Sequence, residues 1–569
     1  MSDIFISEAS PNVEIHLPDG RTLTGPRGSR LVDFLKVIEP DLAAPVVGAV
    51  INGELHELTY TVQMESRVQP VTMADSDGAR IYRRSLTFLL EAAFFNIFPD
   101  SILSIDHSVA SGGYYCHVRQ GDKLTAADIK AVEMEMRRLV ELDLPLNKKE
   151  VTVEEALSFF QTMKYDDIVR LIKFRTKKYV TLYSLGDHVD YHHGYMVPST
   201  GFLKWFELLE SNGGFILRFP RRKTPTSLEK MDVFPKLMTA FRLYGDWLER
   251  LGIESVGALD EAIQAGRSQE IILVSEALHE QHIAEIARQI ADRRDQARLV
   301  LISGPSSSGK TTFSRRLAVQ LLALGLSPYA LELDNYFVDR DATPRDARGE
   351  FDFETIEALD LVKLGKDLNS LVAGEEVQLP HYDFKNGRSE VGDVVQLRKS
   401  QLIILEGIHG LNPRLIPARL AGKSFKVYVS ALTQLNLDRH NRVSTTDTRL
   451  IRRIVRDARE RGYVASQTLN RWESVRRGEK IHIFPYQENA DVMFNSALAY
   501  ELAVLQPIIE PLLRQVPYGT PEHIETKRLL ALLDWFLPME MDQVPDNSIL
   551  REFIGKSILK DFKVWGSQV

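Results

Sequence analysis

The sequence predicts several domains in series, with a parallel sheet flanked by helices in the C-terminal half and smaller α+β units before it. The apolar run at residues 299–302 is typical of a buried strand, and GPSSSGKT follows it at once. A helical pattern comes next, with Phe313, Leu317 and Leu321 at i, i+4 and i+8. Residues 13–70 instead alternate apolar and polar residues around hairpin signals. A length of 569 residues suggests roughly three or four domains.

The composition is that of a globular protein with large cores. Hydrophobic residues make up 44% of the chain and charged residues 26%. The net charge of −8 argues against binding nucleic acid over the whole surface, although it leaves room for a local basic patch. A single cysteine, Cys116, excludes an intramolecular disulfide and a Cys-rich zinc module. We see neither a signal peptide nor an apolar run long enough to span a membrane, so we expect a cytoplasmic enzyme without a membrane partner.

The strand, the G-x-x-x-x-G-K-[ST] loop and the helix together predict a P-loop, which binds the phosphates of a nucleoside triphosphate. Glycines let backbone N–H groups turn toward phosphate oxygens, and the helix start adds the positive end of its dipole. The alternative is a chance turn rich in Gly and Ser. We expect Lys310 to bridge the β- and γ-phosphates of ATP and the Thr311 hydroxyl to hold Mg²⁺. The predicted ATP-binding residues are Gly304, Ser306, Ser307, Ser308, Gly309, Lys310, Thr311 and Thr312.

Two acidic residues follow further predicted strands of the same sheet. Asp334 lies just past the short apolar stretch of ALELDNYF, and Glu406 ends the apolar run at residues 402–405. Ligand groups gather at the carboxyl ends of parallel strands, so both should lie near the phosphates. Asp334 could accept a proton from an attacking hydroxyl, and Glu406 could help to hold Mg²⁺. The alternative is that either acid is a solvated loop residue.

Arginines recur at helical spacing later in the chain, at positions 449, 452, 456 and 459. One interpretation is an exposed, salt-bridged helix, which the possible pair Arg453–Asp457 supports. The other is a lid whose guanidinium groups close over the triphosphate, because Arg matches phosphate oxygens in geometry and charge.

The N-terminal part carries two hairpin signals, at Asp19-Gly20 and Asn52-Gly53, around a short helical pattern. This order resembles the ubiquitin-like TGS domain, a β-grasp fold found at the start of threonyl-tRNA synthetases. From Tyr82 onward, RRSLTFLLEAAFFNIFP, GGYYCHVRQGDKLTAADIKAVEMEMRRL and HVDYHHGYMVPSTGF resemble the second, α+β module of the same enzymes.

The synthetase family builds the pocket of this second module from His-x-x-x-His and Cys-x-x-x-His. The corresponding positions here are Arg84 and Phe88, then His192 and Met196. We therefore expect the fold without the metal site or editing chemistry. His188, His192 and His193 could form a residual metal or acid–base site. We favour a polar loop with one core histidine, because no carboxylate or thiolate stands at ligand spacing in the sequence.

The remaining segments connect or extend these units. Arg221, Arg222 and Lys223 could contact RNA, but a solvated run of charge is favoured because no aromatic stacking platform accompanies them. A new helix is expected to start near Ser275, and the tail should bury an apolar stripe against another domain, with Arg551 able in principle to reach an active site. The predicted units are 1–75 (TGS-like), 76–220 (synthetase-like), 221–270 (helical connector), 271–510 (kinase-like) and 511–569 (helical tail).

Six motifs of the C-terminal half occur in the order seen in the phosphoribulokinase/uridine kinase family, which they resemble: GPSSSGKTTF, LELDNYF, LPHYDFKNGRS, LIILEGIHG, TRLIRRIVRDARERG and ENADVMFNSAL. The resemblance implies a P-loop kinase domain that uses ATP and Mg²⁺ to phosphorylate a nucleoside 5′-hydroxyl. It further implies Asp334 as the base, Asp352 on the ribose hydroxyls, Tyr382 and Phe384 around the nucleobase, and Arg456 and Arg461 as lid arginines.

Two positions depart from the uridine kinase pattern. Lys385-Asn386-Gly387 occupies the region where that family has a histidine, and Tyr463 stands where it has an arginine. Because two polar groups that would hydrogen-bond the base are replaced here, the identity of the base stays open. The alternatives are a kinase for another small hydroxyl acceptor, such as a sugar phosphate, and an ATP-gated RNA-binding or regulatory protein. The sequence leaves the oligomeric state open.

Overall fold

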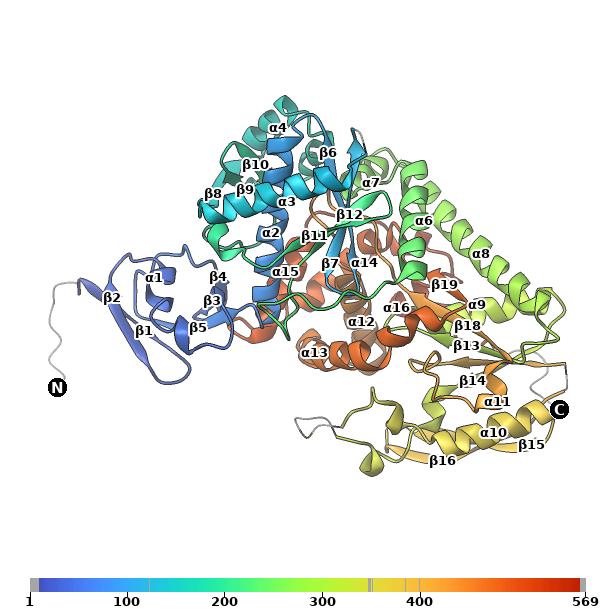
Figure 1. Cartoon of the computed structure of the whole chain (residues 1–569). Helices are drawn as coiled ribbons and strands as arrows, with labels where there is room; N and C mark the ends of the chain where they lie inside the picture. Colours follow the sequence, from blue (N-terminus) through green and yellow to red (C-terminus); the bar gives the residue numbers. More distant parts are fainter. Residues whose placement is uncertain are drawn as a thin grey trace.

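The computed structural model describes residues 10–121, 123–345, 349, 351–383, 385–398 and 400–562. Figure 1 shows a small N-terminal domain at one end, a second domain above, and an α/β domain that contains the parallel sheet. Within the described residues, no helix is both long enough and apolar enough to cross a membrane.

The N-terminal domain is a five-stranded sheet in the order β2-β1-β5-β3-β4 that holds a short helix. Both predicted hairpins are present, since β1 pairs with β2 and β3 with β4 in antiparallel register. Strands β1 and β5 are parallel, which is the arrangement of a β-grasp. The elements are β1 (Asn12–His16), β2 (Thr22–Pro26), α1 (Leu31–Leu35), β3 (Val46–Ile51), β4 (Glu54–His56) and β5 (Ser66–Thr72).

The second domain is built around the long helix α2 (Ser76–Ile97), whose residues Leu86, Phe88 and Leu89 are fully buried. One antiparallel sheet has the order β11-β12-β7-β6 and the other β10-β9-β8. Capping boxes at Thr125 and Thr152 fix the starts of α3 and α4. The elements are β6 (Ile102–Val109), β7 (Gly113–Gln120), α3 (Ala126–Glu141), β8 (Asn147–Thr152), α4 (Val153–Thr162), α5 (Asp166–Lys173), β9 (Tyr179–Leu185), β10 (His188–Tyr191), β11 (Glu207–Ser211) and β12 (Gly214–Arg218).

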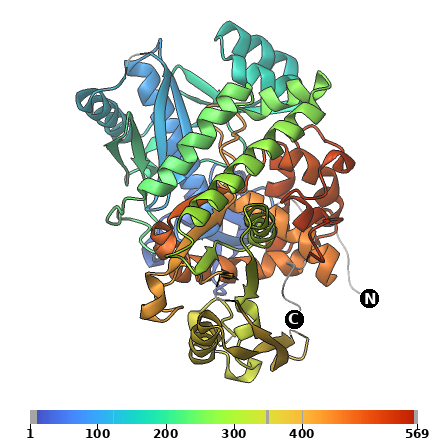
Figure 2. The same ribbon diagram turned by 90° about the vertical axis from the view of Figure 1, so that its right-hand side faces the viewer.

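Three helices connect the second domain to the parallel sheet: α6 (Pro235–Leu251), α7 (Val256–Gln264) and α8 (Ser268–Asp292). In the turned view of Figure 2, the green helices of residues 235–292 cross the face of the molecule between these two parts. The expected helix start near Ser275 is wrong, because α8 already begins at Ser268. Ile271 and Ile272 are fully buried, so their packing extends the helix toward its N-terminus.

The α/β domain contains a parallel sheet in the order β14-β17-β13-β18-β19. Alternate residues of β13 point to opposite faces. Val300 and Ile302 share a core with Phe313 of α9, whereas Leu299 and Leu301 share another with the leucines of α10. The predicted parallel sheet with helices on both faces is confirmed. Its strands are β13 (Leu299–Ser303), β14 (Pro328–Glu332), β17 (Leu402–Glu406), β18 (Ser424–Ser430) and β19 (Val492–Asn495).

Further elements surround the carboxyl ends of these strands. A hairpin of β15 and β16 projects from the sheet, and α12 and α13 pack against each other. The elements are α9 (Lys310–Ala323), the 3₁₀ turn η3 (Leu333–Tyr336), α10 (Leu361–Ala373), β15 (Glu376–Asp383), β16 (Arg388–Gln396), α11 (Ala418–Ala421), α12 (Thr445–Arg461), α13 (Ala465–His482), α14 (Glu501–Leu513), α15 (Pro521–Leu533) and α16 (Arg551–Ile554).

One part of the second domain, around α4 and α5, shares one continuous core with the α/β domain and the tail, whereas α2 and the β11-β12-β7-β6 sheet have a core of their own. Phe160 of α4, Leu317 of α9 and Leu529 of α15 all belong to the shared core and are fully buried. The tail therefore buries its apolar stripe against the rest of the chain, as expected. Thr520 caps α15 by accepting a hydrogen bond from the backbone N–H of His523, and α16 ends at Gly555, whose φ is +92°.

Candidate active site at the P-loop

The loop between β13 and α9 has the backbone geometry that a phosphate site requires. A Cβ atom at Gly304 would lie 1.9 Å from the carbonyl oxygen of Val429, so only glycine fits there. Ser307 and Gly309 both have positive φ, at +57° and +83°. The buried hydroxyls of Ser307 and Ser308 have no hydrogen-bond partner among the described residues. These residues therefore fit a triphosphate, which supplies the acceptors that the loop lacks.

The loop is held by groups from α12 and α13. The backbone N–H of Ser306 donates to Glu479 at 3.0 Å, and the Ser306 hydroxyl accepts from Arg453 at 2.8 Å. Arg449 donates to the carbonyl oxygen of Ser306 at 3.1 Å and pairs with Glu479. Lys310 Nζ donates to the carbonyl oxygen of Pro305 at 3.2 Å. Four charged side chains thus line the loop that the sequence predicted to bind ATP.

The two predicted magnesium ligands lie side by side. The Thr311 hydroxyl donates to Glu406 Oε2 at 3.3 Å. Burial raises the pKa of Glu406 to about 7, helped by the charges of Asp334 and Glu552, while Lys310 acts in the opposite direction. A hydroxyl and a carboxylate are oxygen ligands of the kind that Mg²⁺ takes in nucleotide sites, so this pair fits the ion.

Asp334, the predicted base, lies in η3, directly after β14. Its side chain keeps contact with solvent. The surrounding protein atoms nevertheless raise the pKa of its carboxyl above the usual value, while Lys310, Arg461 and Arg456 oppose that rise. The charges of the P-loop lysine and of both predicted lid arginines therefore act on the Asp334 carboxyl.

Helix α12 carries the arginine series, and its residues have two different environments. Arg449 and Arg452 are buried at 1% and 0% exposure, so the interpretation as an exposed salt-bridged helix is wrong for them. Arg456 and Arg461 instead flank Asp457, with N–O distances of 3.6 and 3.2 Å. A lid role for these two arginines stays a prediction.

Tyr382, one of the predicted acceptor residues, lies on β15, which packs against η3, the turn that carries Asp334. The backbone N–H of Tyr382 donates to Asn335 at 3.3 Å, and the Tyr382 ring lies 5.6 Å from the Phe337 ring. Asp352 Oδ1 accepts from the backbone N–H of Glu354 at 3.0 Å. Phe384, the third residue of this prediction, lies outside the described residues.

Sequence reasoning missed Glu354, Glu479 and Glu552. Burial raises the pKa of Glu354 to about 7, and Glu479, Arg453 and Lys310 are near enough to affect it. Glu552 of α16 accepts from the backbone N–H of Thr312 at 3.2 Å and from its hydroxyl at 3.0 Å. Because Glu354 lies two residues from Asp352, the sequence could have indicated it as a site residue. No pattern in the sequence pointed to Glu552. Its neighbour Arg551 instead donates to the carbonyl oxygen of Met541, away from the loop.

In the second domain, the positions that correspond to the pocket of the synthetase module lie close together, but side chains fill the space between them. Phe88 is fully buried, and its ring centre lies 5.4 Å from that of His192. Arg84 donates to the carbonyl oxygen of Tyr195 at 2.8 Å. The expectation of a polar loop is wrong, because His188 and His192 are buried at 4% and 1% exposure against a shared carboxylate, Glu91.

Comparison with known proteins agrees with a division into a synthetase-like N-terminal part and a kinase-like C-terminal part. Residues 299–502 match the model of the phosphoribulokinase / uridine kinase family, and residues 13–72 match that of the TGS domain. The N-terminal region is 31% identical over 205 residues to the threonine–tRNA ligase of Thermotoga petrophila, a match that covers 36% of this chain and 31% of that enzyme. The ligase of Symbiobacterium thermophilum is 30% identical over 204 residues, with the same coverage. The chain thus spans about a third of the length of the curated relatives it matches.

Two solved structures also match part of the chain. A putative fructose transport system kinase from Silicibacter sp. TM1040 is 20% identical, with a TM-score of 0.27, over 37% of this chain and 98% of that one. A possible uridine kinase from Bacillus stearothermophilus is 20% identical, with a TM-score of 0.25, over 36% of this chain and 100% of that one.

The motifs around the P-loop, the order of the parallel sheet and the match of the family model thus agree with one another. Residues 299–502 form a kinase domain of the phosphoribulokinase / uridine kinase family, behind a TGS domain at residues 13–72.

Proposed function

We propose that this protein transfers the γ-phosphoryl group of ATP to the hydroxyl group of a small acceptor. The first candidate acceptor is the 5′-hydroxyl of a nucleoside. The observation that carries the proposal is the position of Asp334, two residues past Glu332, which pairs with Glu406 in the strand beside β13 and its P-loop. A P-loop that only bound nucleotide would need no acid at that point.

Each charged group has a task in this reaction. Asp334 takes the proton of the attacking hydroxyl, which makes the oxygen a better nucleophile. Lys310, Arg456 and Arg461 offset the negative charge that spreads over the phosphoryl oxygens as the group moves. Thr311 and Glu406 would hold Mg²⁺, which would supply positive charge beside the phosphates. The backbone N–H groups of residues 306–312 orient the triphosphate tail.

The proposed acceptor site includes Asp352 and Tyr382. A carboxylate suits the paired hydroxyls of a ribose, and an aromatic ring suits a flat base. Arg340, Asp339 and Asp383 all act on the Tyr382 phenol, whose pKa is raised by burial and by the two acids and lowered by Arg340. This cation favours a second candidate acceptor, a sugar phosphate, whose phosphate group Arg340 would bind.

A panel of acceptors separates these candidates. The full chain is incubated with ATP and Mg²⁺ and with nucleosides or sugar phosphates, and ADP formation is followed beside the Asp334→Asn variant. Turnover with a nucleoside, lost in the variant, supports the first candidate. Turnover only with phosphorylated sugars supports the second, and Arg340→Gln should then raise KM for the acceptor.

A third outcome would contradict both candidates. If ATP binds but no acceptor gives turnover, filter binding of tRNA tests for an ATP-gated RNA-binding protein, a class that the net charge of −8 does not favour. Tight binding that weakens steeply with salt would then move the function to that class.

A further inference from the structure

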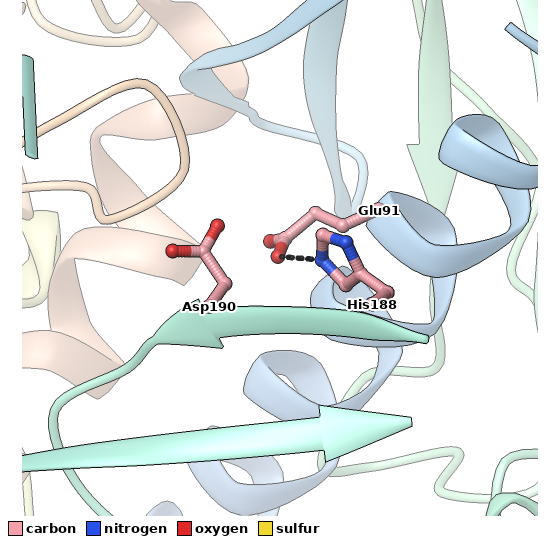
Figure 3. Close-up of side chains that lie close together, drawn as sticks. All are labelled: Glu91, His188 and Asp190. Carbon is pink, nitrogen blue, oxygen red and sulfur yellow. Dashed lines mark hydrogen bonds and ion pairs between the residues drawn. The ribbon is translucent and has the colours of Figure 1, made fainter. Parts of the chain in front are cut away.

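A buried cluster of histidines and carboxylates lies where the second domain meets the α/β domain. Glu91 comes from α2, His188 and Asp190 from β10, and His192 from the turn that follows. His440 comes from the segment between β18 and α12 of the kinase half. Figure 3 shows His188 directed at the Glu91 carboxylate, with Asp190 beside this pair. All five residues are at most 8% exposed.

The donor atoms are spaced as they would be around one metal ion. Glu91 Oε2 lies 3.5 Å from His188 Nε2, 3.0 Å from His192 Nε2 and 3.6 Å from His440 Nδ1. One donor atom from each of Glu91, His188 and Asp190 lies within 4.8 Å of the other two. Tetrahedral zinc with bonds of about 2.0–2.1 Å places its ligand atoms roughly 3.4 Å apart, so the three distances from Glu91 Oε2 suit a shared ion.

Hydrogen bonding within the cluster leaves it incomplete. Three imidazole nitrogens approach Glu91 Oε2, whereas the other oxygen, Glu91 Oε1, is buried and has no hydrogen-bond partner among the described residues. Among the described residues, every ion pair of Glu91 and of Asp190 is made with a histidine. If both buried carboxylates are ionised, a divalent cation would balance their two negative charges.

The surroundings hold the ligands in place from both halves of the molecule. His440 Nδ1 lies 2.6 Å from Asp190 Oδ2, across 250 residues of chain. Asp438 orders the His440 segment by accepting from the backbone N–H groups of His440 and Asn441, both at 2.8 Å. The Asn441 side chain donates to the carbonyl oxygen of Tyr191 at 2.9 Å, beside the β10 ligands.

We propose that Glu91, His188 and Asp190, with His192 and His440 beside them, bind a divalent transition metal of the zinc type that fastens the second domain to the kinase domain. Mixed imidazole and carboxylate donors suit zinc and its neighbours, whereas Mg²⁺ prefers oxygen ligands alone. Because every ligand is buried, the site is structural. Asp190 lies in the same segment as His188 and His192, whereas Glu91 and His440 come from elements far away in the sequence.

The test uses the full chain without an affinity tag, stripped with a chelator and then dialysed against Zn²⁺ or Co²⁺ in the absence of nucleotide. We expect one metal ion per chain by mass spectrometry of the elements, a visible absorption band from bound Co²⁺, and a Tm several degrees higher with Zn²⁺ than without. His188→Gln and Glu91→Gln should each lose the metal, the band and the rise in Tm.

Two matched variants act as controls. His279→Gln replaces another buried histidine, on α8, and should keep the metal. Glu406→Gln alters the predicted magnesium site and should also keep it, which separates this site from the nucleotide site. Wild-type protein that takes up neither Zn²⁺ nor Co²⁺ would overturn the proposal. So would a folded His188→Gln protein that binds the metal as wild type does.

Discussion

At the scale of single residues, the position of Asp334 leads to the most direct prediction. Asp334→Asn keeps the shape of the side chain but removes the acceptor for the hydroxyl proton. We expect kcat to fall about 10²–10⁴-fold, the usual contribution of a general base. The Kd for ATP should change little, because the P-loop amides bind the phosphates. Single-turnover kinetics and calorimetry measure the two quantities.

Asp341→Asn serves as the control, since Asp341 is an exposed acid in the same segment. Its kcat should equal that of wild type. Equal losses in both variants, or no loss in Asp334→Asn, would remove Asp334 from the reaction.

Asp260 on α7 leads to a prediction about stability and pH. Burial raises the pKa of its carboxyl to about 7, although it accepts a hydrogen bond from the backbone N–H of Leu537 at 2.9 Å. Since this value lies above the usual 3.8, the stability that protonated Asp260 contributes is fully present below pH 3.8 and is lost as the pH rises through 7.

The Asp260→Asn variant stays neutral and should escape this loss. Relative to wild type, its free energy of unfolding should rise by about 2 kcal/mol between pH 5.5 and pH 8, because one pKa unit corresponds to about 1.4 kcal/mol. Urea unfolding at the two pH values measures the difference. Asp246→Asn, at an exposed acid on α6, should show none, and an identical pH dependence in Asp260→Asn and wild type would contradict the assignment.

The sequence revealed those site residues that its own short motifs contain. Gly304, Lys310 and Thr311 belong to one loop, and Glu406 ends a strand that pairs beside it, so their proximity follows from the order of the sheet. Glu552 and Glu91 could not be predicted, because each contacts a site that is built by segments far away in the chain. No local pattern distinguishes such residues from ordinary surface acids.

At the scale of elements, the short helix α16 matters for nucleotide binding. Its Glu552 accepts from the backbone N–H of Thr312, a group that the sequence predicts to contact phosphate, and the side chain of Ile549 lies against Gly309. A carboxylate there competes with a phosphate for the same donor and also repels it.

Glu552→Gln should therefore tighten ATP binding several-fold, because the amide removes the repulsion between this side chain and the triphosphate. Calorimetry with ATP and Mg²⁺ measures the change. Glu540→Gln, at an exposed acid of the same tail, is the control and should bind ATP as wild type does. Weaker binding by Glu552→Gln would show that the tail supports the nucleotide site.

Element boundaries depend on tertiary packing that the sequence does not show directly. The N-cap and first residue of α15 were predicted correctly, because Thr520 and Pro521 act locally. The start of α8 was placed too late, because its first turns are stabilised by burial of Ile271 and Ile272 in the core. Local capping signals were thus more informative than hydrophobic spacing.

At the scale of the whole molecule, the shared core couples the second domain to the nucleotide site. Phe160 of α4 belongs to the same buried cluster as Ile302 and Phe313, which flank the P-loop. The Asp167 carboxylate of α5 accepts from Arg439 of the kinase half at 2.9 Å, which adds a polar link across the junction. The N-terminal domain has a separate core that contains Phe34.

Phe160→Ala should therefore destabilise both halves together. The loss of a fully buried phenylalanine costs about 3–5 kcal/mol, and cooperative packing should spread this cost to β13 and α9. Hydrogen exchange followed by mass spectrometry should show faster exchange in peptides from the P-loop region as well as from α4. Phe34→Ala is the matched control and should speed exchange only in the N-terminal domain, because its cluster is separate. If Phe160→Ala left exchange at the P-loop unchanged, the shared apolar core would not couple the second domain to the kinase site.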